Sequence, residues 1–239
     1  MISQNKIVKQ PVLAVIIVAA GTGSRMQSSE HKQFLKLGGK PVLENTIMVF
    51  DRHPMVREII LVSHEADLRR VNDEIITPGT FKKVEKVVAG GATRTASVKA
   101  GLQMITDEIT HVAIHDGARP LVTPAMLDSV FAKGITTGAA ILAVKITDTI
   151  KETDDEGKVL STIPRQGLWS AQTPQVFDRT WIESAYGSLS QGASATDDAA
   201  VLEAAGYSVY TVECSKENLK ITVPSDLFQA EMILKSRRK

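Results

Sequence analysis

Short, continuous apolar runs alternate with amphipathic stretches along most of the chain. Runs of roughly 4–8 residues rich in Val, Ile and Ala are typical of buried strands, whereas apolar positions three and four residues apart are typical of helices. Strands that alternate with helices indicate a mostly parallel sheet with helices on both faces. We therefore predict an α/β protein with one domain over residues 11–239, after a loose leader over 1–10. The predicted strands cover 11–18, 58–63, 83–91, the start of 111–120, 139–144 and 207–213, and the predicted helices cover 39–53, 93–105, 123–134, 224–236 and two segments around Ala185 and Val201.

Two of these helices carry signals at their ends. Pro41 is expected in the first turn of the 39–53 helix, where a helix needs no amide donor. Thr123 is expected as the N-cap of the 123–134 helix, with Pro124 in its first helical position. Gly134 is expected to end that helix.

Residues 145–165 break the alternation of strands and helices. Polar and apolar residues alternate there around an acidic turn that contains a glycine, which is typical of an exposed hairpin. An isolated two-stranded hairpin is only marginally stable in water. We therefore predict an arm that finds its partner in a second copy of the chain, in a symmetric homodimer.

The stretch AAGTGSRMQSSEHKQF, residues 19–34, follows the first predicted strand. Ligands of open α/β sheets bind at such carboxyl ends of strands. A P-loop would need Lys-Ser or Lys-Thr behind the glycines, and neither is present. A dinucleotide-binding turn would need glycine in place of Met26, and its acidic residue, Glu44, falls inside a predicted helix. The remaining use is a nucleoside triphosphate held by loop amides and by the cations Arg25 and Lys32.

Composition limits the partners of the protein. The 239 residues carry a formal net charge of +1, so we expect neither nucleic acid nor a membrane as a partner.

The single cysteine, Cys214, fits a reducing compartment, and we expect a cytoplasmic protein. Lys6 and Lys9 before the apolar run 12–20 mimic a secretory signal, but this run is followed by charged, periodic segments, as a first strand would be.

Seven sequence blocks resemble one known family when they are read in order. They are AAGTGSRM with KQF, AGGATRTASV, HDGARP, DTIK, QTPQVF, ATDDA and NLKIT. With these blocks the chain resembles the sugar-phosphate cytidylyltransferases, and within them the branch that uses 2-C-methyl-D-erythritol 4-phosphate. The similarity runs from about residue 12 to the last helix. It implies a Rossmann-like α/β domain with a protruding β-arm used for dimerisation.

The resemblance also implies a reaction. A cytidylyl group passes from CTP to 2-C-methyl-D-erythritol 4-phosphate, in the non-mevalonate isoprenoid pathway, and pyrophosphate leaves. Because two anions must meet, catalysis of this kind depends on charge neutralisation and positioning, without a covalent enzyme intermediate. Arg25 and Lys32 match the family's cations over the triphosphate, and Lys220 in NLKIT faces the phosphates.

Further roles follow from the same resemblance. Asp116 in HDGARP contacts the substrate and holds Mg²⁺, an ion that prefers hard oxygen ligands and bridges phosphate oxygens. Arg119 is implied to be a substrate-side or structural cation near the same edge. His115 is expected to be structural, and Asn218 is expected to support the waters of the metal. The implied nucleotide-binding residues are Ala19, Ala20, Gly21, Gly23, Gly91 and Ser97.

Two residues of the arm are implied to serve the neighbouring subunit. Thr149 in DTIK and Arg165 in IPRQG match positions that hold the polyol phosphate across the dimer. A hydroxyl and a planar guanidinium are suited to a phosphate group. The family thus implies an active site shared between two chains.

Two other functions stay open. Ribitol 5-phosphate cytidylyltransferases share the fold, the glycine loop and the arm, but more often carry a bulkier pair in place of Gly117 and Ala118. A nucleotide-binding protein without catalytic activity is the alternative outside the enzymes, although each expected charged position is filled in this sequence.

Overall fold

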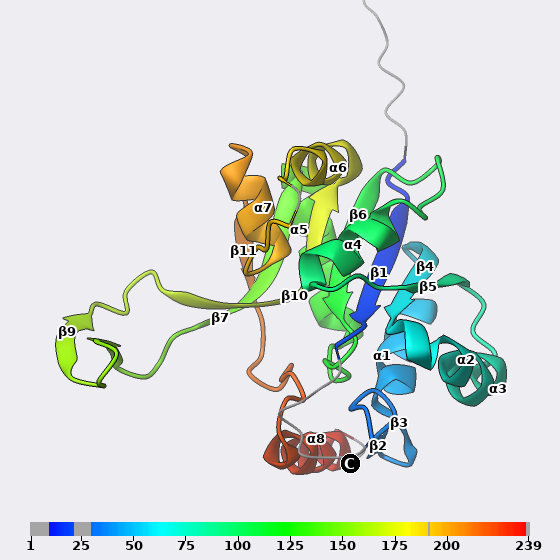
Figure 1. Ribbon diagram of the computed structural model, residues 1–239, viewed down its shortest axis with the longest axis horizontal. Coiled ribbons are helices and arrows are strands. Elements are labelled where there is room, and N and C mark those ends of the chain that lie inside the picture. Colours follow the sequence, from blue (N-terminus) through cyan, green and yellow to red (C-terminus); the bar gives the residue numbers. More distant parts are fainter. Residues whose placement is uncertain (1–9, 22–29, 191, 238–239) are drawn as a thin grey trace, which may run out of the picture.

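A twisted central sheet organises the protein in the computed structural model, which describes residues 10–21, 30–190 and 192–237 (Figure 1). Within these residues the sheet has seven strands in the order β11-β7-β10-β6-β1-β4-β5. All neighbours are parallel except β10, which runs antiparallel to both β6 and β7. The mostly parallel sheet predicted from the sequence is therefore confirmed. The strands are β1 (Leu13–Ala19), β4 (Val56–Ser63), β5 (Val84–Ala89), β6 (His111–Asp116), β7 (Ala139–Lys145), β10 (Trp169–Asp178) and β11 (Tyr210–Glu213).

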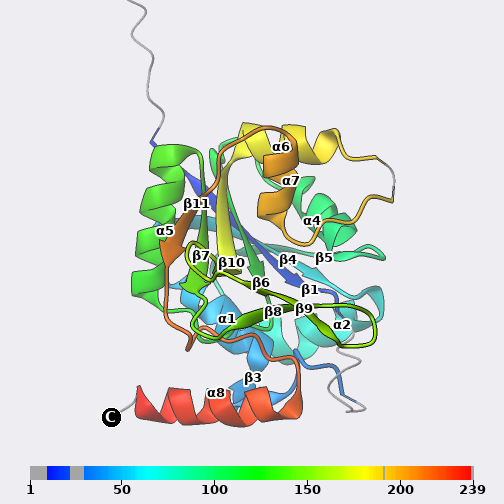
Figure 2. The same cartoon turned by 90° about the vertical axis from the view of Figure 1, so that its left-hand side faces the viewer.

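Helices cover both faces of this sheet, as the alternation of elements predicted (Figure 2). Successive side chains of a strand point to opposite faces. On β1, Val15 and Ile17 therefore pack with α1 and α5, whereas Ala14 and Ile16 pack with α4, α6 and α7. The helices of these two layers are α1 (Val42–Asp51), α4 (Arg94–Leu102), α5 (Pro124–Thr137), α6 (Arg179–Gly187) and α7 (Asp198–Ala204).

A third, smaller core lies under the last helix, α8 (Pro224–Ser236). Ala230 of this helix packs with Leu37 of the small hairpin formed by β2 (Lys36–Leu37) and β3 (Lys40–Pro41). No helix in the described ranges is long and apolar enough to cross a bilayer.

The structure corrects the predicted course of α5. Thr123 caps the helix and Pro124 is its first residue, as predicted, but the helix continues past Gly134 to Thr137. Gly138, at a φ of +84°, is the residue that ends it. Gly134 is instead a packing residue, because an added Cβ would lie 2.6 Å from Val176 Cγ1 on β10.

Two smaller corrections concern the first half of the chain. Pro41 precedes α1 as its N-cap and is not part of its first turn. A helical stretch that the sequence analysis did not predict follows β4 over residues 65–79. It consists of η2 (Glu65–Asp67), α2 (Leu68–Val71), the π-helical turn η3 (Asn72–Ile76) and α3 (Thr77–Gly79).

The hairpin expected within 145–165 is present. It consists of β8 (Ile150–Thr153) and β9 (Val159–Ile163), which pair antiparallel and project away from the sheet (Figure 1). Gly157 in its turn has a φ of +84°, a conformation that favours glycine. Val159 and Leu160 are 54% and 58% exposed on this arm. The predicted leader lies outside the described residues, apart from residue 10.

Candidate active site

The carboxyl ends of β1, β5 and β6 meet at one edge of the sheet and surround a pocket of about 240 Å³. The position of β1 explains why the pocket forms there. The chain runs from β1 to β4 and β5 on one side and then crosses to β6 on the other, and ligands of open α/β sheets bind at such a switch point. The predicted nucleotide-binding residues in the described part of the chain all line this pocket, namely Ala19, Ala20, Gly21, Gly91 and Ser97.

The loops after β1 and β5 approach closely on one side of the pocket. A Cβ on Gly90 would lie 2.5 Å from the Cβ of Ala20 and 2.7 Å from Ser97 Oγ. The Ser97 hydroxyl donates to the Thr93 carbonyl at 3.0 Å and accepts from the Gly91 amide at 3.1 Å. Ser97 thereby fixes the glycine loop, and a contact of its hydroxyl with a nucleotide stays a prediction.

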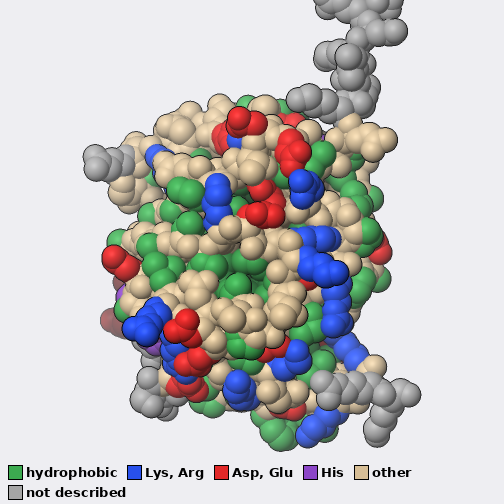
Figure 3. All heavy atoms as spheres, turned by 90° about the vertical axis from the view of Figure 1, so that its right-hand side faces the viewer, with side chains coloured by type: hydrophobic (Ala, Val, Ile, Leu, Met, Phe, Trp, Pro, Cys, Tyr) green, Lys and Arg blue, Asp and Glu red, His purple; other side chains and the backbone are tan. Residues whose placement is uncertain are grey.

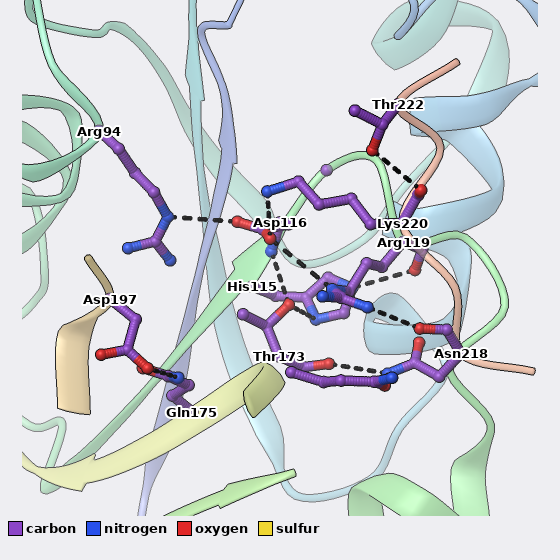
Figure 4. A network of polar contacts seen from close by, with 12 residues as sticks. Arg94, His115, Asp116, Arg119, Thr173, Gln175, Asp197, Asn218, Lys220 and Thr222 are labelled. Carbon is purple, nitrogen blue, oxygen red and sulfur yellow. Dashed lines mark hydrogen bonds and ion pairs between the residues drawn. The ribbon is translucent and has the colours of Figure 1, made fainter. Parts of the chain in front are cut away.

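Asp116, at the end of β6, lies among three cations (Figure 4). Its Oδ2 is 2.7 Å from Lys220 Nζ and 3.7 Å from Arg119 Nε, and its Oδ1 is 3.3 Å from Arg94 Nε. Burial alone would raise the pKa of Asp116, but the charges of Lys220 and Arg94 outweigh this and hold the pKa well below its ordinary value. Asp116 is therefore an ionised carboxylate at neutral pH.

Arg94 is a site residue that the sequence analysis missed. It begins α4 and joins Asp116 to Asp198, whose Oδ2 lies 2.7 Å from its guanidinium. Asp198 is fully buried and also accepts a hydrogen bond of 2.6 Å from the Tyr186 hydroxyl. Burial disfavours the charge on Arg94, but Asp198 and Asp116 overcome this and raise its pKa above the ordinary value.

His115 supports the site from behind. It is fully buried, with Nδ1 3.1 Å from the Thr173 hydroxyl and Nε2 3.1 Å from the Arg119 carbonyl. Burial lowers its pKa to about 4, so the ring is neutral at pH 7. The Thr173 hydroxyl in turn accepts a hydrogen bond of 3.0 Å from the Asp116 amide. These contacts agree with the structural role predicted for His115.

Asn218 contacts two residues that line the second side of the site, Arg119 and Thr173. Its side chain is buried, and its amide nitrogen donates to the Thr173 carbonyl at 3.0 Å and to Gln172 Oε1 at 2.9 Å. Its backbone carbonyl accepts a hydrogen bond of 2.7 Å from Arg119 (Figure 4). Asn218 thus fixes Arg119 and the loop that carries Lys220, and its support of the waters of a metal stays a prediction.

A second pocket, of about 330 Å³, adjoins the first. The two pockets share Arg94, Asp116 and Lys220 as lining residues. The rest of the second pocket is largely polar and includes Arg119, Gln172, Thr173, Gln175, Thr196 and Asp197. The two pockets therefore meet at one carboxylate and two cations.

Thr149 and Arg165 do not line these two pockets. Thr149 and Arg165 are exposed at the base of the arm, where the Arg165 guanidinium donates to the Thr147 carbonyl. Gly23 and Arg25 lie outside the described residues. Lys32, in contrast, lines the first pocket.

The carboxylates of the site set limits on metal binding. No group of three or more His, Cys, Asp or Glu side chains in the described part of the chain could hold a metal ion. Asp116 is the carboxylate that borders both pockets, and it is ionised. Mg²⁺ at phosphate sites is commonly held by one or two carboxylates, with substrate phosphates and water as its other ligands. The donor set therefore fits Mg²⁺ only together with a bound phosphate compound.

An α/β fold with a glycine-lined pocket and a cluster of cations at the switch point defines a nucleotidyltransferase. The family model of 2-C-methyl-D-erythritol 4-phosphate cytidylyltransferase matches residues 13–236, and the chain belongs to this family. An enzyme of that name from Syntrophotalea carbinolica is 46% identical over 222 residues, which cover 92% of this chain and 95% of the relative. One from Alkaliphilus oremlandii is 42% identical over 94% of this chain and 96% of the relative. The crystal structure of 4-diphosphocytidyl-2C-methyl-D-erythritol synthase from Anaerococcus prevotii superposes with a TM-score of 0.81 at 30% identity, over 94% of this chain and 99% of that one.

Proposed function

We propose that this chain transfers the cytidylyl group of CTP to 2-C-methyl-D-erythritol 4-phosphate and releases pyrophosphate. One observation carries the proposal beyond family membership. Two pockets adjoin and share Arg94, Asp116 and Lys220, so two phosphate compounds can meet at a common charged wall. A transfer between two anions needs such a place, because their charges must be neutralised where they meet.

The first pocket suits the nucleotide. The backbone of Ala20, Gly21 and Gly91 borders it, so amides and carbonyls can contact a base and a ribose without intervening side chains. Lys32 on the same pocket supplies a cation for the triphosphate. Arg25, by family position, supplies a second one.

The second pocket suits the polyol phosphate. Thr173, Gln175 and Asp197 offer hydrogen-bond partners for hydroxyl groups. Arg119 and Lys220 provide positive charge for the phosphate. In this arrangement a phosphate oxygen of the acceptor attacks the α-phosphorus of CTP in line with the leaving pyrophosphate. Lys32 and Lys220 would then stabilise the charge that develops on the phosphate oxygens.

We propose Mg²⁺ as the cofactor and Asp116 as its protein ligand. The support is the ionised state of Asp116 and its position beside both pockets. When bound, the ion would supply Lewis-acid neutralisation of phosphate oxygens. Lys220, now 2.7 Å from Asp116, would pair with a substrate phosphate instead.

We further propose a homodimer in which the arm completes the partner's site. Val159 and Leu160 are more than half exposed on a hairpin that, alone, would be marginally stable. Thr149 and Arg165 do not line the two pockets of their own chain, as expected of residues that serve a neighbour.

A cytoplasmic location is also proposed, because Cys214 is the single cysteine of the sequence.

Pyrophosphate release tests the proposed reaction. The enzyme is supplied with CTP and Mg²⁺, and methylerythritol phosphate and ribitol 5-phosphate are offered in parallel, with UTP as the nucleotide control. We expect turnover with CTP and methylerythritol phosphate. Turnover with ribitol phosphate alone would assign the protein to the other branch, and no turnover with either acceptor would favour a non-catalytic nucleotide-binding protein.

A further inference from the structure

The two neighbours of Lys32 in the sequence are tied to a single oxygen atom. His31 Nδ1 lies 2.6 Å from Asp67 Oδ2, and Gln33 Nε2 donates to the same oxygen at 2.9 Å. Asp67 is 8% exposed and ends η2, the first turn of the helical stretch 65–79. One carboxylate therefore anchors the chain on both sides of Lys32.

A second residue of the same helical stretch extends this anchor. Arg70 on α2 lies 2.6 Å from the Glu30 carboxylate, and its guanidinium stacks 3.8 Å from the centre of the Phe34 ring. Residues 30, 31, 33 and 34 thus contact the helical stretch, and Lys32 between them lines the nucleotide pocket together with Gln33. A turn with a hydrogen bond of 3.0 Å from the Phe34 amide to the His31 carbonyl keeps the segment compact.

The surface around this stretch shows why Asp67 differs from its neighbours. On the face that includes α2 and β5, basic and acidic side chains lie next to one another (Figure 3). Arg69 and Asp73 form such a pair at 3.5 Å, with side chains 94% and 65% exposed. Exposed pairs of this kind contribute little to stability. Asp67 is instead buried and contacts the segment that carries Lys32.

We infer that Asp67 is a positioning residue that holds Lys32 toward the triphosphate. A lysine side chain is long and flexible, so its charge is effective in catalysis only where its backbone is fixed in advance. Asp67 supplies that fixation through His31 and Gln33. The inference rests on the proposed role of Lys32.

A double-mutant cycle between Asp67 and Lys32 tests this inference. Asp67→Ala, Lys32→Ala and the double variant are compared with the unaltered enzyme by pyrophosphate release, with melting temperatures as a check on folding. We expect Asp67→Ala to lower kcat/KM for CTP about tenfold and to leave KM for the polyol phosphate unchanged. In the Lys32→Ala background the same change should alter kcat/KM less than about twofold, because a residue that acts through Lys32 has nothing left to position.

Three further variants sharpen the comparison. Asp67→Asn keeps an oxygen that can accept a hydrogen bond, so this variant should retain most of the activity that Asp67→Ala loses. Asp73→Ala, on the same helical stretch, is the matched control and should leave the activity of each background, unaltered or Lys32→Ala, unchanged. Should Asp67→Ala fail to fold, His31→Ala removes one of the two anchors and takes its place in the cycle.

The outcomes distinguish a failure of the positioning role of Asp67 from a failure of the proposed role of Lys32. The positioning role would be overturned if Asp67→Ala lowered kcat/KM equally in the unaltered and the Lys32→Ala enzymes. It would also be overturned if Asp67→Ala lost no activity while Lys32→Ala was impaired. Full activity of Lys32→Ala would overturn the proposed role of Lys32 itself, and the positioning role with it.

Discussion

Lys220 Nζ lies 2.7 Å from Asp116 Oδ2, and both residues border both pockets. Arg94 and Arg119 also face the Asp116 carboxylate, and Arg94 forms a second ion pair with Asp198. Three cations thus stand against two carboxylates in this network. The remaining positive charge lies where a phosphate group of either substrate would bind.

Replacing Lys220 tests the importance of this charge. We expect Lys220→Gln to lower kcat/KM by roughly 10²–10³, the loss typical of one preorganised electrostatic group. The melting temperature checks folding, because Lys220→Gln also removes a cation that stabilises the buried Asp116 carboxylate. Initial rates of pyrophosphate release measure the effect, with Lys235→Gln on α8 as the control. A loss below about threefold would remove Lys220 from the catalytic residues.

Burial of His115 predicts a pH dependence of stability. Its pKa is lowered from 6.5 to about 4 in the folded protein, so below pH 6.5 the unfolded chain takes up a proton that the folded one refuses. The free energy of unfolding should therefore fall as the pH drops from 6.5 to 4, by about 3 kcal/mol from this residue.

Denaturant unfolding at several pH values checks this expectation. His115→Gln lacks the titrating group, so its stability should fall less steeply over the same interval. The other histidines are common to both proteins and cancel in the comparison. Parallel pH curves for the two proteins would contradict the assignment.

Gly134 should be intolerant of even a methyl group. Alanine normally stabilises a helix relative to glycine, but here the added Cβ would lie 2.6 Å from Val176 Cγ1 and 2.8 Å from its Cβ. We expect Gly134→Ala to lower the free energy of unfolding by about 1–3 kcal/mol, as overpacked cores do. Chemical denaturation measures the change.

Two variants control for this prediction. Gly187→Ala at the end of α6 meets nothing within 4 Å and should be neutral or stabilising. Val176→Ala removes Cγ1, the nearest obstructing atom, so the double variant with Gly134→Ala should lose less stability than the two single losses added together. Additive losses would locate the strain elsewhere.

Gly134 also shows where sequence reasoning reaches its limit. The sequence favours a helix stop at this glycine, and only the contact with β10 shows that packing placed it there. The helical stretch 65–79 was not predicted for a related reason. It has few buried apolar residues, chiefly Val71 and Ile75, and Pro78 follows them. Most of the sheet was predictable because its strands contain continuous apolar runs, which are local signals, whereas β10 was not predicted as a strand.

The site residues could likewise be predicted only where the signal for them is local in the sequence. Asp116 and Lys32 stand in short motifs next to a strand or a glycine loop, so the sequence alone could find them. The importance of Arg94 depends on Asp116 and Asp198, which are 22 and 104 residues away in the chain. No local pattern links these three residues, and only the fold brings them together.

A shared site predicts complementation between two inactive enzymes. Lys32→Ala removes a cation that lines the nucleotide pocket, and Arg165→Ala removes one on the arm. Each variant alone should be nearly inactive if the arm reaches the neighbouring site. After joint unfolding and refolding, each mixed dimer would hold one site built from an intact pocket and an intact arm.

With random pairing, half of the dimers are mixed and each has one restored site, so roughly a quarter of all sites should regain activity. Different affinity tags on the two chains verify that mixed dimers form, and each variant refolded alone is the control. Because the two substitutions lie on different chains, a gain on mixing requires that the intact arm of one chain serves the intact pocket of the other. Mixed dimers that recover no activity would mean that the arm serves its own subunit, and the shared site would have to be abandoned.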